Sequence, residues 1–155
     1  MTARTRNAHL YVFPDFVVLI PVNTSVDGVG LEADPIARLG TLEASAETGA
    51  ALRNALGHSR RGVPHPTDWK LVASEVRARN RAAGIKSAKH LHESAKLVVV
   101  RETDLAFEVT PCRNGGSTGP DRGYHDLTDA TLTLDRIASD EELGRAIARA
   151  AAICR

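Results

Sequence analysis

The amino-acid sequence predicts an α+β fold, in which a mainly antiparallel β-sheet carries about three helices packed on it. Short apolar or alternating runs, such as residues 16–20 and 97–100, are typical of strands. Longer segments with helical periodicity begin at capping residues or end at glycine. Residues 102–104 separate two expected strands and have the length of a hairpin connection, which makes these strands antiparallel neighbours.

The composition is that of an ordinary globular protein. The chain has 155 residues, of which 43% are apolar and 25% are charged, so we expect a single domain over residues 1–155. The basic start has no apolar run of signal-peptide length after it, and residues 16–20 are too few to span a bilayer. We therefore expect a cytoplasmic protein without a membrane segment. Cys112 and Cys154 form no CxxC motif, which favours two small buried side chains in a reducing compartment.

The first part of the chain predicts strands followed by one helix. In order, we expect strands over residues 11–13 and 16–20, a loop over 21–35, a strand over 36–41 and a helix over 45–56. The run 16–20 is apolar without alternation, which indicates a strand covered on both faces. The loop is expected because prolines bound a stretch of Asn, Ser, Asp and Gly residues. Leu52 and Leu56 lie one turn apart on the helix, and Gly57 ends it.

Residues 62–70 read Gly-Val-Pro-His-Pro-Thr-Asp-Trp-Lys and are the most informative stretch of the chain. Pro64 and Pro66 fix their own backbone angles and push the residues before them out of the helical region. The segment is therefore a stiff extended arm. Thr67 is expected to cap a helix over residues 67–83.

This helix carries the only tryptophan of the chain in its first turn. Trp69, Val72 and Val76 share one helix face, at spacings of i, i+3 and i+7. A large aromatic side chain at the start of a helix is usually buried, so we expect Trp69 to lie in the hydrophobic core. In this interpretation the arm and the helix start form an architectural joint.

The second part of the chain predicts two more helices and three more strands. In order, we expect a short helix capped by Ser87, strands over residues 97–100 and 105–110, a polar loop over 112–126, a strand over 131–134 and a helix from Ser139 to Cys154. Residues 105–110 alternate between apolar and polar, which indicates a strand with one buried face. Ser139 and Glu142 have the spacing of a capping box.

Charge is unevenly distributed along the chain. Residues 1–59 have a net charge of −2, residues 60–101 of +7 and residues 102–155 of −4, which together give +1. The basic centre has two interpretations, a phosphate-binding face or a solvated helix whose charge the acidic flanks neutralise. A small nucleic-acid-binding domain that uses the basic 60–96 region is therefore an alternative function. Aromatic side chains that stack on bases are scarce, so direct nucleic-acid binding is not expected.

The sequence contains no catalytic or metal-binding constellation. His90 and His92 lie two apart on an expected helix and point to nearly opposite sides, without a third ligand at a standard spacing. Residues 114–119 are rich in glycine but lack the lysine of a phosphate-binding loop. Residues 58–68 contain the residue types of a hydrolase triad, but no nucleophile elbow. We therefore expect no enzymatic activity, no cofactor and no metal.

Several of these segments together resemble immunity proteins of bacterial contact-dependent growth inhibition (CDI) systems. The stretch at residues 62–70 is the most specific of them. The others, in chain order, are YVFPD at 11–15, AGIKS at 83–87, VTPCRN at 109–114 and SDEELGRAI at 139–147. The resemblance implies a small cytoplasmic protein that binds one cognate toxin, the C-terminal domain of a large CDI exoprotein and often a nuclease. It also implies that the protein blocks the active site or substrate path of the toxin and performs no chemistry itself.

Carboxylates suit the binding face of such an inhibitor, because nuclease domains present cationic surfaces to phosphate. The candidate toxin-binding residues lie in the two long loops: Asp27, Glu32 and Asp34 in the first, and Asp121, Tyr124 and Asp126 in the second. Among them, Tyr124 has the side chain of an aromatic anchor. The net charge of +1 differs from that of a strongly acidic inhibitor. A second arrangement is therefore open, in which the basic centre meets an acidic toxin surface.

Overall fold

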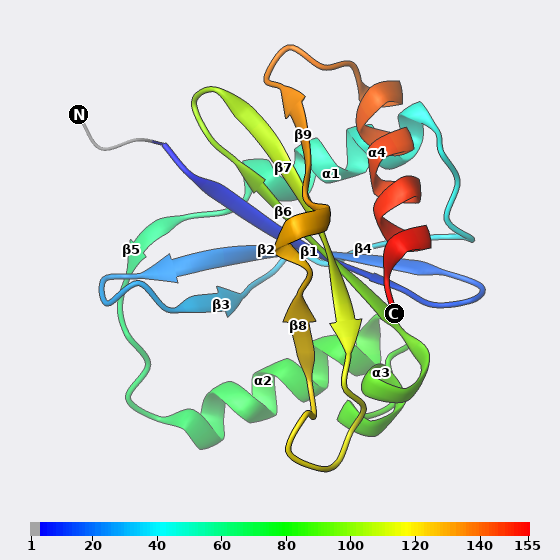
Figure 1. Cartoon of the computed structure of the whole chain (residues 1–155). Coiled ribbons are helices and arrows are strands. Elements are labelled where there is room, and N and C mark those ends of the chain that lie inside the picture. Colours follow the sequence, from blue (N-terminus) through cyan, green and yellow to red (C-terminus); the bar gives the residue numbers. More distant parts are fainter. Residues whose placement is uncertain (1–3) are drawn as a thin grey trace.

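The computed structural model describes residues 4–155 and shows a curled sheet with helices on both of its faces (Figure 1). The strands are β1 Arg6–Val12, β2 Val17–Ser25, β3 Gly30–Glu32, β4 Ala37–Leu39, β5 Arg61–Val63, β6 Lys96–Glu102, β7 Ala106–Asn114, β8 Tyr124–Asp126 and β9 Leu132–Asp135. The helices are α1 Ala46–Gly57, α2 Trp69–Ala82, α3 Ala88–Ser94 and α4 Asp140–Ile153, with a 3-10 turn at Thr128–Ala130. The predicted α+β class with a mainly antiparallel sheet is confirmed.

The order of the strands places β1 inside the sheet. The path runs β3-β2-β1-β6-β7-β8, and in addition β4 and β5 pair with β2 while β9 pairs with β7. These pairs are antiparallel except for β2 with β5. Phe13 N donates to Phe16 O at 2.9 Å and closes the tight turn between β1 and β2. The antiparallel pair expected across residues 102–104 is confirmed as β6 and β7.

The two longest strands, β2 and β7, each change their outer partner at a proline. The outer edge of β2 pairs first with β4 and then with β3, and Pro21 lies between the two pairings. The outer edge of β7 pairs with β9 and then with β8, and Pro111 lies between them. Proline has no N–H to donate to a ladder, so it is tolerated at such a gap. The two proline carbonyls still accept hydrogen bonds, from Ala33 N at 2.8 Å and Leu127 N at 2.9 Å.

This arrangement corrects both expected loops. Residues 21–35 are not one loop, because β2 continues through Pro21 to Ser25 and β3 follows. Residues 112–126 begin with the end of β7 and close with β8. The sequence interpretation took proline as the end of a strand. In the structure both strands continue past their prolines, because no outer strand accepts a hydrogen bond at those positions.

Each face of the sheet is covered by its own hydrophobic cluster. Alternate residues of β1 point to opposite faces, with Leu10 on one side and Tyr11 on the other. The expected apolar run 16–20 forms the start of β2 and contributes to both clusters. The helix residues buried on the Leu10 side include Leu52, Leu56, Leu143 and Ile147. The residues packed on the Tyr11 side from the α2–α3 region are Ala83, Ile85 and Leu91.

Both long helices of the Leu10 side begin at the serine that the sequence indicates. Ser45 Oγ accepts a hydrogen bond from Thr48 N at 3.4 Å, and Ser139 Oγ accepts one from Glu142 N at 3.1 Å. Each cap satisfies one N–H group that the first helical turn leaves without an intrahelical partner. The helices α1 and α4 are therefore confirmed close to their predicted positions.

The helix expected over residues 67–83 is observed as α2, with Asp68 rather than Thr67 as its cap. Asp68 Oδ1 accepts from two backbone N–H groups of the first turn, both at 3.1 Å, and its negative charge suits the helix dipole. The prediction of a buried Trp69 is wrong, because 52% of its surface is exposed. The physical reason is that α2 buries none of its residues, so its first turn has no core to enter.

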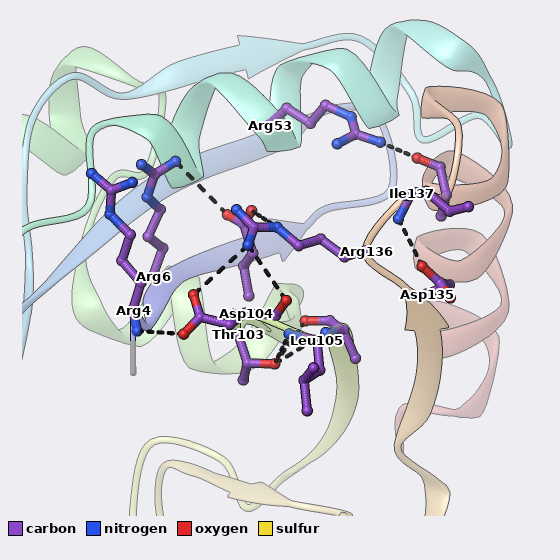
Figure 2. A network of polar contacts seen from close by, with 12 residues as sticks. Arg4, Arg6, Arg53, Thr103, Asp104, Leu105, Asp135, Arg136 and Ile137 are labelled. Atoms are coloured by element: carbon purple, nitrogen blue, oxygen red, sulfur yellow. Dashed lines mark hydrogen bonds and ion pairs between the residues drawn. The ribbon is translucent and has the colours of Figure 1, made fainter. Parts of the chain in front are cut away.

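A network of polar contacts holds the β6–β7 turn to the segment between β9 and α4 (Figure 2). Arg136 Nε lies 3.9 Å from Glu102 Oε1, and Arg136 Nη1 lies 3.7 Å from Asp104 Oδ1. Two apolar side chains flank these contacts and are almost fully exposed, Leu105 at 84% and Ile137 at 90%. Figure 1 shows this turn at the top of the view, at the opposite end from α2.

Candidate binding surface

The curl of the sheet brings residues from both of its edges to one side chain, Tyr11 of β1. Glu32, at the end of β3, lies close enough to the Tyr11 hydroxyl for its carboxylate to act on the pKa of that group. From the other edge, the ring centroid of Tyr124 on β8 lies 5.9 Å from that of Tyr11. Burial, and next the Glu32 carboxylate, raises the pKa of the Tyr11 hydroxyl well above its usual value. Glu32 and Tyr124, which come from separate parts of the sequence, therefore lie on one face of the sheet.

Tyr124 is tied to the rest of the protein by its hydroxyl. The Oη atom lies 2.9 Å from the carbonyl oxygens of both Leu91 and Ala95, where α3 ends. The Tyr124 ring also lies against the ring of His92, with 5.3 Å between centroids. Burial is the main cause of the raised pKa of Tyr124. The side chain is half-buried. Through its hydroxyl it joins β8 to the end of α3.

The other acidic residues of the first group lie around α2. Asp27 Oδ2 lies 3.4 Å from His65 Nδ1 on the arm before α2, and Asp34 Oδ1 lies 3.2 Å from Arg79 Nε in the last turn of α2. Both carboxylates are largely exposed, at 65% and 78% of their side-chain surface. Arg79 Nη1 also donates to the backbone oxygen of Glu32 at 2.9 Å. The β2–β3 hairpin therefore contacts the arm before α2, and the segment after β3 contacts the last turn of α2.

The two remaining acidic candidates lie at the other edge of the sheet. Asp121 is 77% exposed and pairs loosely with Arg113, with 3.9 Å between Oδ2 and Nη1. Asp126 Oδ1 accepts a hydrogen bond from Cys112 Sγ at 3.4 Å. Burial, and next the Asp126 carboxylate, raises the pKa of the Cys112 thiol. Asp121 is thus an exposed carboxylate with a loose ion pair to Arg113, whereas Asp126 is a partner of a buried thiol. Both cysteines are free, Cys112 buried and Cys154 half-buried.

The exposed side of α2 carries a cationic stripe. Lys70, Arg77 and Arg81 are exposed and lie on one side of the helix, at spacings of seven and four residues. Within residues 4–155, none of the three has a carboxylate within ion-pair distance. Val72 and Val76 are half-buried on the opposite side, toward the rest of the protein. The stripe is therefore available to a partner.

Apolar side chains are exposed beside this stripe, at the start of α2 and on the tip of the β2–β3 hairpin. Trp69 and Leu71 are 52% and 56% exposed, and Val26 and Val29 are 66% and 37% exposed. The hairpin tip lies next to the arm before α2, because Val26 N donates to Val63 O at 2.9 Å. We call these four exposed apolar residues, with the cationic stripe, the α2 surface.

Sequence reasoning missed the α2 surface because it placed Trp69 in the core. The spacing of Trp69, Val72 and Val76 predicted one buried face. Of the three, the two valines are half-buried and Trp69 is exposed. The position of Leu71 could have predicted this exposure, because Leu71 lies on a different side of the helix from Trp69, Val72 and Val76. A helix that has large apolar side chains on two sides of its first turn exposes one of them in any orientation.

The other chemical candidates serve structural roles. Ser59 Oγ donates to Val22 O at 2.6 Å and accepts from Asn7 N at 3.0 Å, while Asp68 caps α2. The glycine-rich segment borders a surface pocket of about 550 Å³ against α3, with Lys89, His92 and Arg122 in its lining. Residues 4–155 contain no group of three or more His, Cys, Asp or Glu side chains placed to hold a metal ion. No helix in this described part of the chain is long and apolar enough to cross a membrane.

Comparison with known proteins adds a family and a shared fold. The family model described as CDI immunity protein matches residues 7–154. A Neisseria meningitidis protein of unknown function superposes with a TM-score of 0.81 and 15% identity, over 98% of this chain and 96% of that chain. A chain of the CdiA-CT/CdiI toxin and immunity complex from Yersinia pseudotuberculosis superposes with a TM-score of 0.76 and 13% identity, over 98% of both chains. No curated protein sequence matches the chain.

Proposed function

Because this chain belongs to the family of CDI immunity proteins, we propose that it binds and neutralises the C-terminal toxin domain of its cognate CDI exoprotein. The match over residues 7–154 is the observation that carries the proposal. The fold shared with a chain of a toxin and immunity complex supports it. The protein acts in the cytoplasm of the cell that receives the toxin, without a cofactor and without chemistry of its own.

The cognate toxin in this proposal is a nuclease, and the immunity protein covers its active site or the path of its substrate. A nuclease presents cations to phosphate, and exposed carboxylates are complementary to them. Asp27, Asp34 and Asp121 have such carboxylates, each more than 60% exposed. Their location on elements that border the Tyr11 side of the sheet supports that side as the binding face.

The six candidate residues have different roles on this face. Asp121 and Asp126, at the β8 edge, contact toxin cations directly. Asp27 and Asp34 flank α2, and their contacts with His65 and Arg79 also set the position of that helix. The last two, Glu32 and Tyr124, support the face from within, since the half-buried Tyr124 and the Glu32 carboxylate both contact Tyr11.

Growth rescue tests the proposed function. The toxin domain encoded next to this protein is induced in a test strain, with and without the protein, and with a CDI toxin of a different system as the specificity control. We expect growth to be restored against the cognate toxin alone, and a stable complex to co-purify. Continued growth arrest together with no complex, from an immunity protein that is folded by circular dichroism, would reject the proposal.

The nuclease assignment has its own test. The purified toxin domain is incubated with RNA and with DNA, and the immunity protein is titrated into the reaction that shows degradation. We expect cleavage to stop near one immunity protein per toxin. If the toxin cleaves neither polymer but is still neutralised in cells, the proposed immunity function stands and the assignment of the toxin as a nuclease is rejected.

A further inference from the structure

The position of α2 is fixed although the helix contributes nothing to the core. None of its 14 residues is buried. Helices in proteins owe most of their stability to the packing of an apolar face, and in α2 this face is limited to the half-buried Val72 and Val76. Polar contacts add to it: Asp27 with His65 before the helix, and Asp34 with Arg79 in its last turn. Most of the surface of α2 is therefore exposed and available to a partner.

The residue types on the α2 surface are those of a protein interface. Exposed tryptophan is enriched among the residues that dominate binding energy, especially where neighbouring apolar side chains exclude water around it. Leu71 is exposed in the same turn as Trp69, and Val26 and Val29 are exposed on the adjacent hairpin tip. Lys70, between Trp69 and Leu71 in the sequence, and Arg77 and Arg81 further along the helix extend the surface, and none of the three cations has an ion-pair partner within residues 4–155. Of these seven residues, three are charged and four are apolar.

We propose that the α2 surface is the principal docking site for the cognate toxin domain, with Trp69 as its central anchor. The proposal rests on the toxin-binding function proposed above. It specifies the chemistry of the partner: an apolar pocket for the indole ring, with carboxylates beside it that face Lys70, Arg77 and Arg81. Complementary charges of this kind set the register of a complex and speed its association.

A protein partner fits these observations better than a nucleic acid. Three cations neutralise few phosphates, and Trp69 is the only aromatic side chain on the α2 surface that stacks on a base. Leu71, Val26 and Val29 have no counterpart in a phosphate backbone. A protein partner with carboxylates around an apolar pocket can bind the cations and the apolar side chains of the α2 surface at the same time.

The docking site also explains why acidic residues lie beside a basic helix. Asp27, which contacts the arm before α2, and Asp34, which contacts its last turn, are positioning residues for the helix. Asp121, at the β8 edge, has no contact of this kind with α2 and meets the toxin on its own. The acidic and basic candidates of the sequence therefore belong to one binding face.

The test measures the Kd of the complex between the full-length protein and the purified toxin domain. Trp69→Ala is expected to weaken binding by at least ~20-fold, the range of a central anchor. The matched control is Leu105→Ala, which removes an 84% exposed leucine at the opposite end of the molecule and should change Kd less than twofold. Since neither side chain is buried, the melting temperature should stay close to that of the wild type in both variants.

Charge is tested by a second variant, Lys70→Glu with Arg77→Glu and Arg81→Glu. We expect weaker toxin binding, and a smaller loss of affinity as salt is raised than the wild type shows. Toxin binding that stays within twofold of wild type in both this variant and Trp69→Ala would overturn the inference and leave the proposed function intact. Absence of wild-type binding would reject the proposed function, and the inference with it. The surface would be assigned to nucleic acid if duplex RNA binds the wild type tightly at physiological salt and this binding is lost in the triple variant but kept in Trp69→Ala.

Discussion

Gly144 in α4 lies directly against the backbone carbonyl group of Ser45, the residue that caps α1. The contact is reciprocal, because Gly49 in α1 meets the backbone of Asp140 at the start of α4. A Cβ atom on either glycine would overlap a carbonyl oxygen of the other helix. Arg53 Nε adds a 2.6 Å contact to Asp140 Oδ1 beside this crossing. The two helices that cover the Leu10 side therefore touch through their backbones near both N-termini.

Gly144→Ala is expected to lower the free energy of unfolding by about 3 kcal/mol, because two backbones would have to move apart. The matched control is Gly57→Ala, at the end of α1, where an added Cβ meets nothing within 4 Å. That change should be neutral or slightly stabilising. Urea unfolding at constant pH measures both. Equal stability of the two variants would contradict the close backbone contact.

Asn114→Ala is expected to lower the free energy of unfolding by about 2–3 kcal/mol. Its Nδ2 donates to His92 O at 2.7 Å and to Ala95 O at 3.1 Å, and its Oδ1 accepts from Gly116 N at 2.8 Å. Each of these bonds contributes about 1 kcal/mol when its partner is left unpaired. Tyr124→Phe, which removes a single hydroxyl that also contacts the Ala95 carbonyl, should cost less. A larger loss in Tyr124→Phe than in Asn114→Ala would show that Asn114 does not link β7 to α3.

The stability of the protein is expected to fall as pH rises above ~8.5, where an unfolded cysteine loses its proton. Burial, and next Asp126, raises the pKa of Cys112, so the folded protein keeps a proton that the unfolded chain has lost. The stabilisation is complete below that pH and is lost toward the higher folded pKa, with a slope of up to ~1.4 kcal/mol per pH unit for one group. Urea unfolding at several pH values should show a flatter slope in Cys112→Ala. An unchanged slope would exclude Cys112 as its source.

The same sign of pH dependence is expected from the tyrosines at higher pH. Burial raises the pKa of both Tyr11 and Tyr124, so each adds a further loss of stability above ~10, where an unfolded tyrosine titrates. In Tyr11→Phe this additional loss should be smaller. The absorbance of tyrosinate at 295 nm, followed with pH, would locate the titration directly.

Arg79→Ala is expected to loosen α2 without unfolding the sheet. Arg79 is 12% exposed and contacts Asp34 and the backbone of Glu32, whereas Arg77 is exposed and unpaired within residues 4–155. Amide hydrogen exchange should therefore become faster in α2 in Arg79→Ala and remain unchanged in Arg77→Ala. Exchange in α1 and α4 should not respond to either change. Equal exchange of α2 in both variants would contradict the role of Arg79 as its tether.

Reversal of charge at Asp121 and Asp126, to lysine, is expected to weaken toxin binding several-fold, and more so at low salt. Asp15→Lys is the matched control, since it makes the same change of charge in the exposed turn between β1 and β2. Asp126 also accepts a bond from Cys112, so the stability of that variant is measured alongside. Unchanged affinity in both variants, with the α2 variants impaired, would remove the β8 edge from the interface.

The sequence predicted the elements whose pattern depends on local physics. The alternation over residues 105–110 correctly predicted a strand that buries Phe107 and Val109, although Leu105 lies before β7 and is 84% exposed. The caps at Ser45 and Ser139 start the helices that they indicate. The hairpin of β6 and β7 followed from the length of its connection. In each case the signal lies within a few residues of the element that it predicts.

The errors come from relationships across long distances in the chain. Pro21 looked like the end of a strand because the gap between β3 and β4, which tolerates it, is invisible in the local sequence. Trp69 looked like core because its exposure depends on the absence of a packing partner for α2. The contact of Glu32 and Tyr124 with Tyr11 needs the curl of the whole sheet, so no spacing could have predicted it.

The strand order has a consequence for synthesis on the ribosome. β1 is synthesised long before β6, its partner on one side, which begins at Lys96, and before α4, which begins at Asp140. β1 can pair at once with β2, but pairing with β6 closes a long loop and is slow, so that edge of β1 stays unpaired until β6 has been translated. A stop codon just before Asp140 would remove α4 and leave α1 as the one long helix on the Leu10 side of the sheet, within the described part of the chain. Shortened products of this reading frame are therefore expected to be unfolded, rather than partly active.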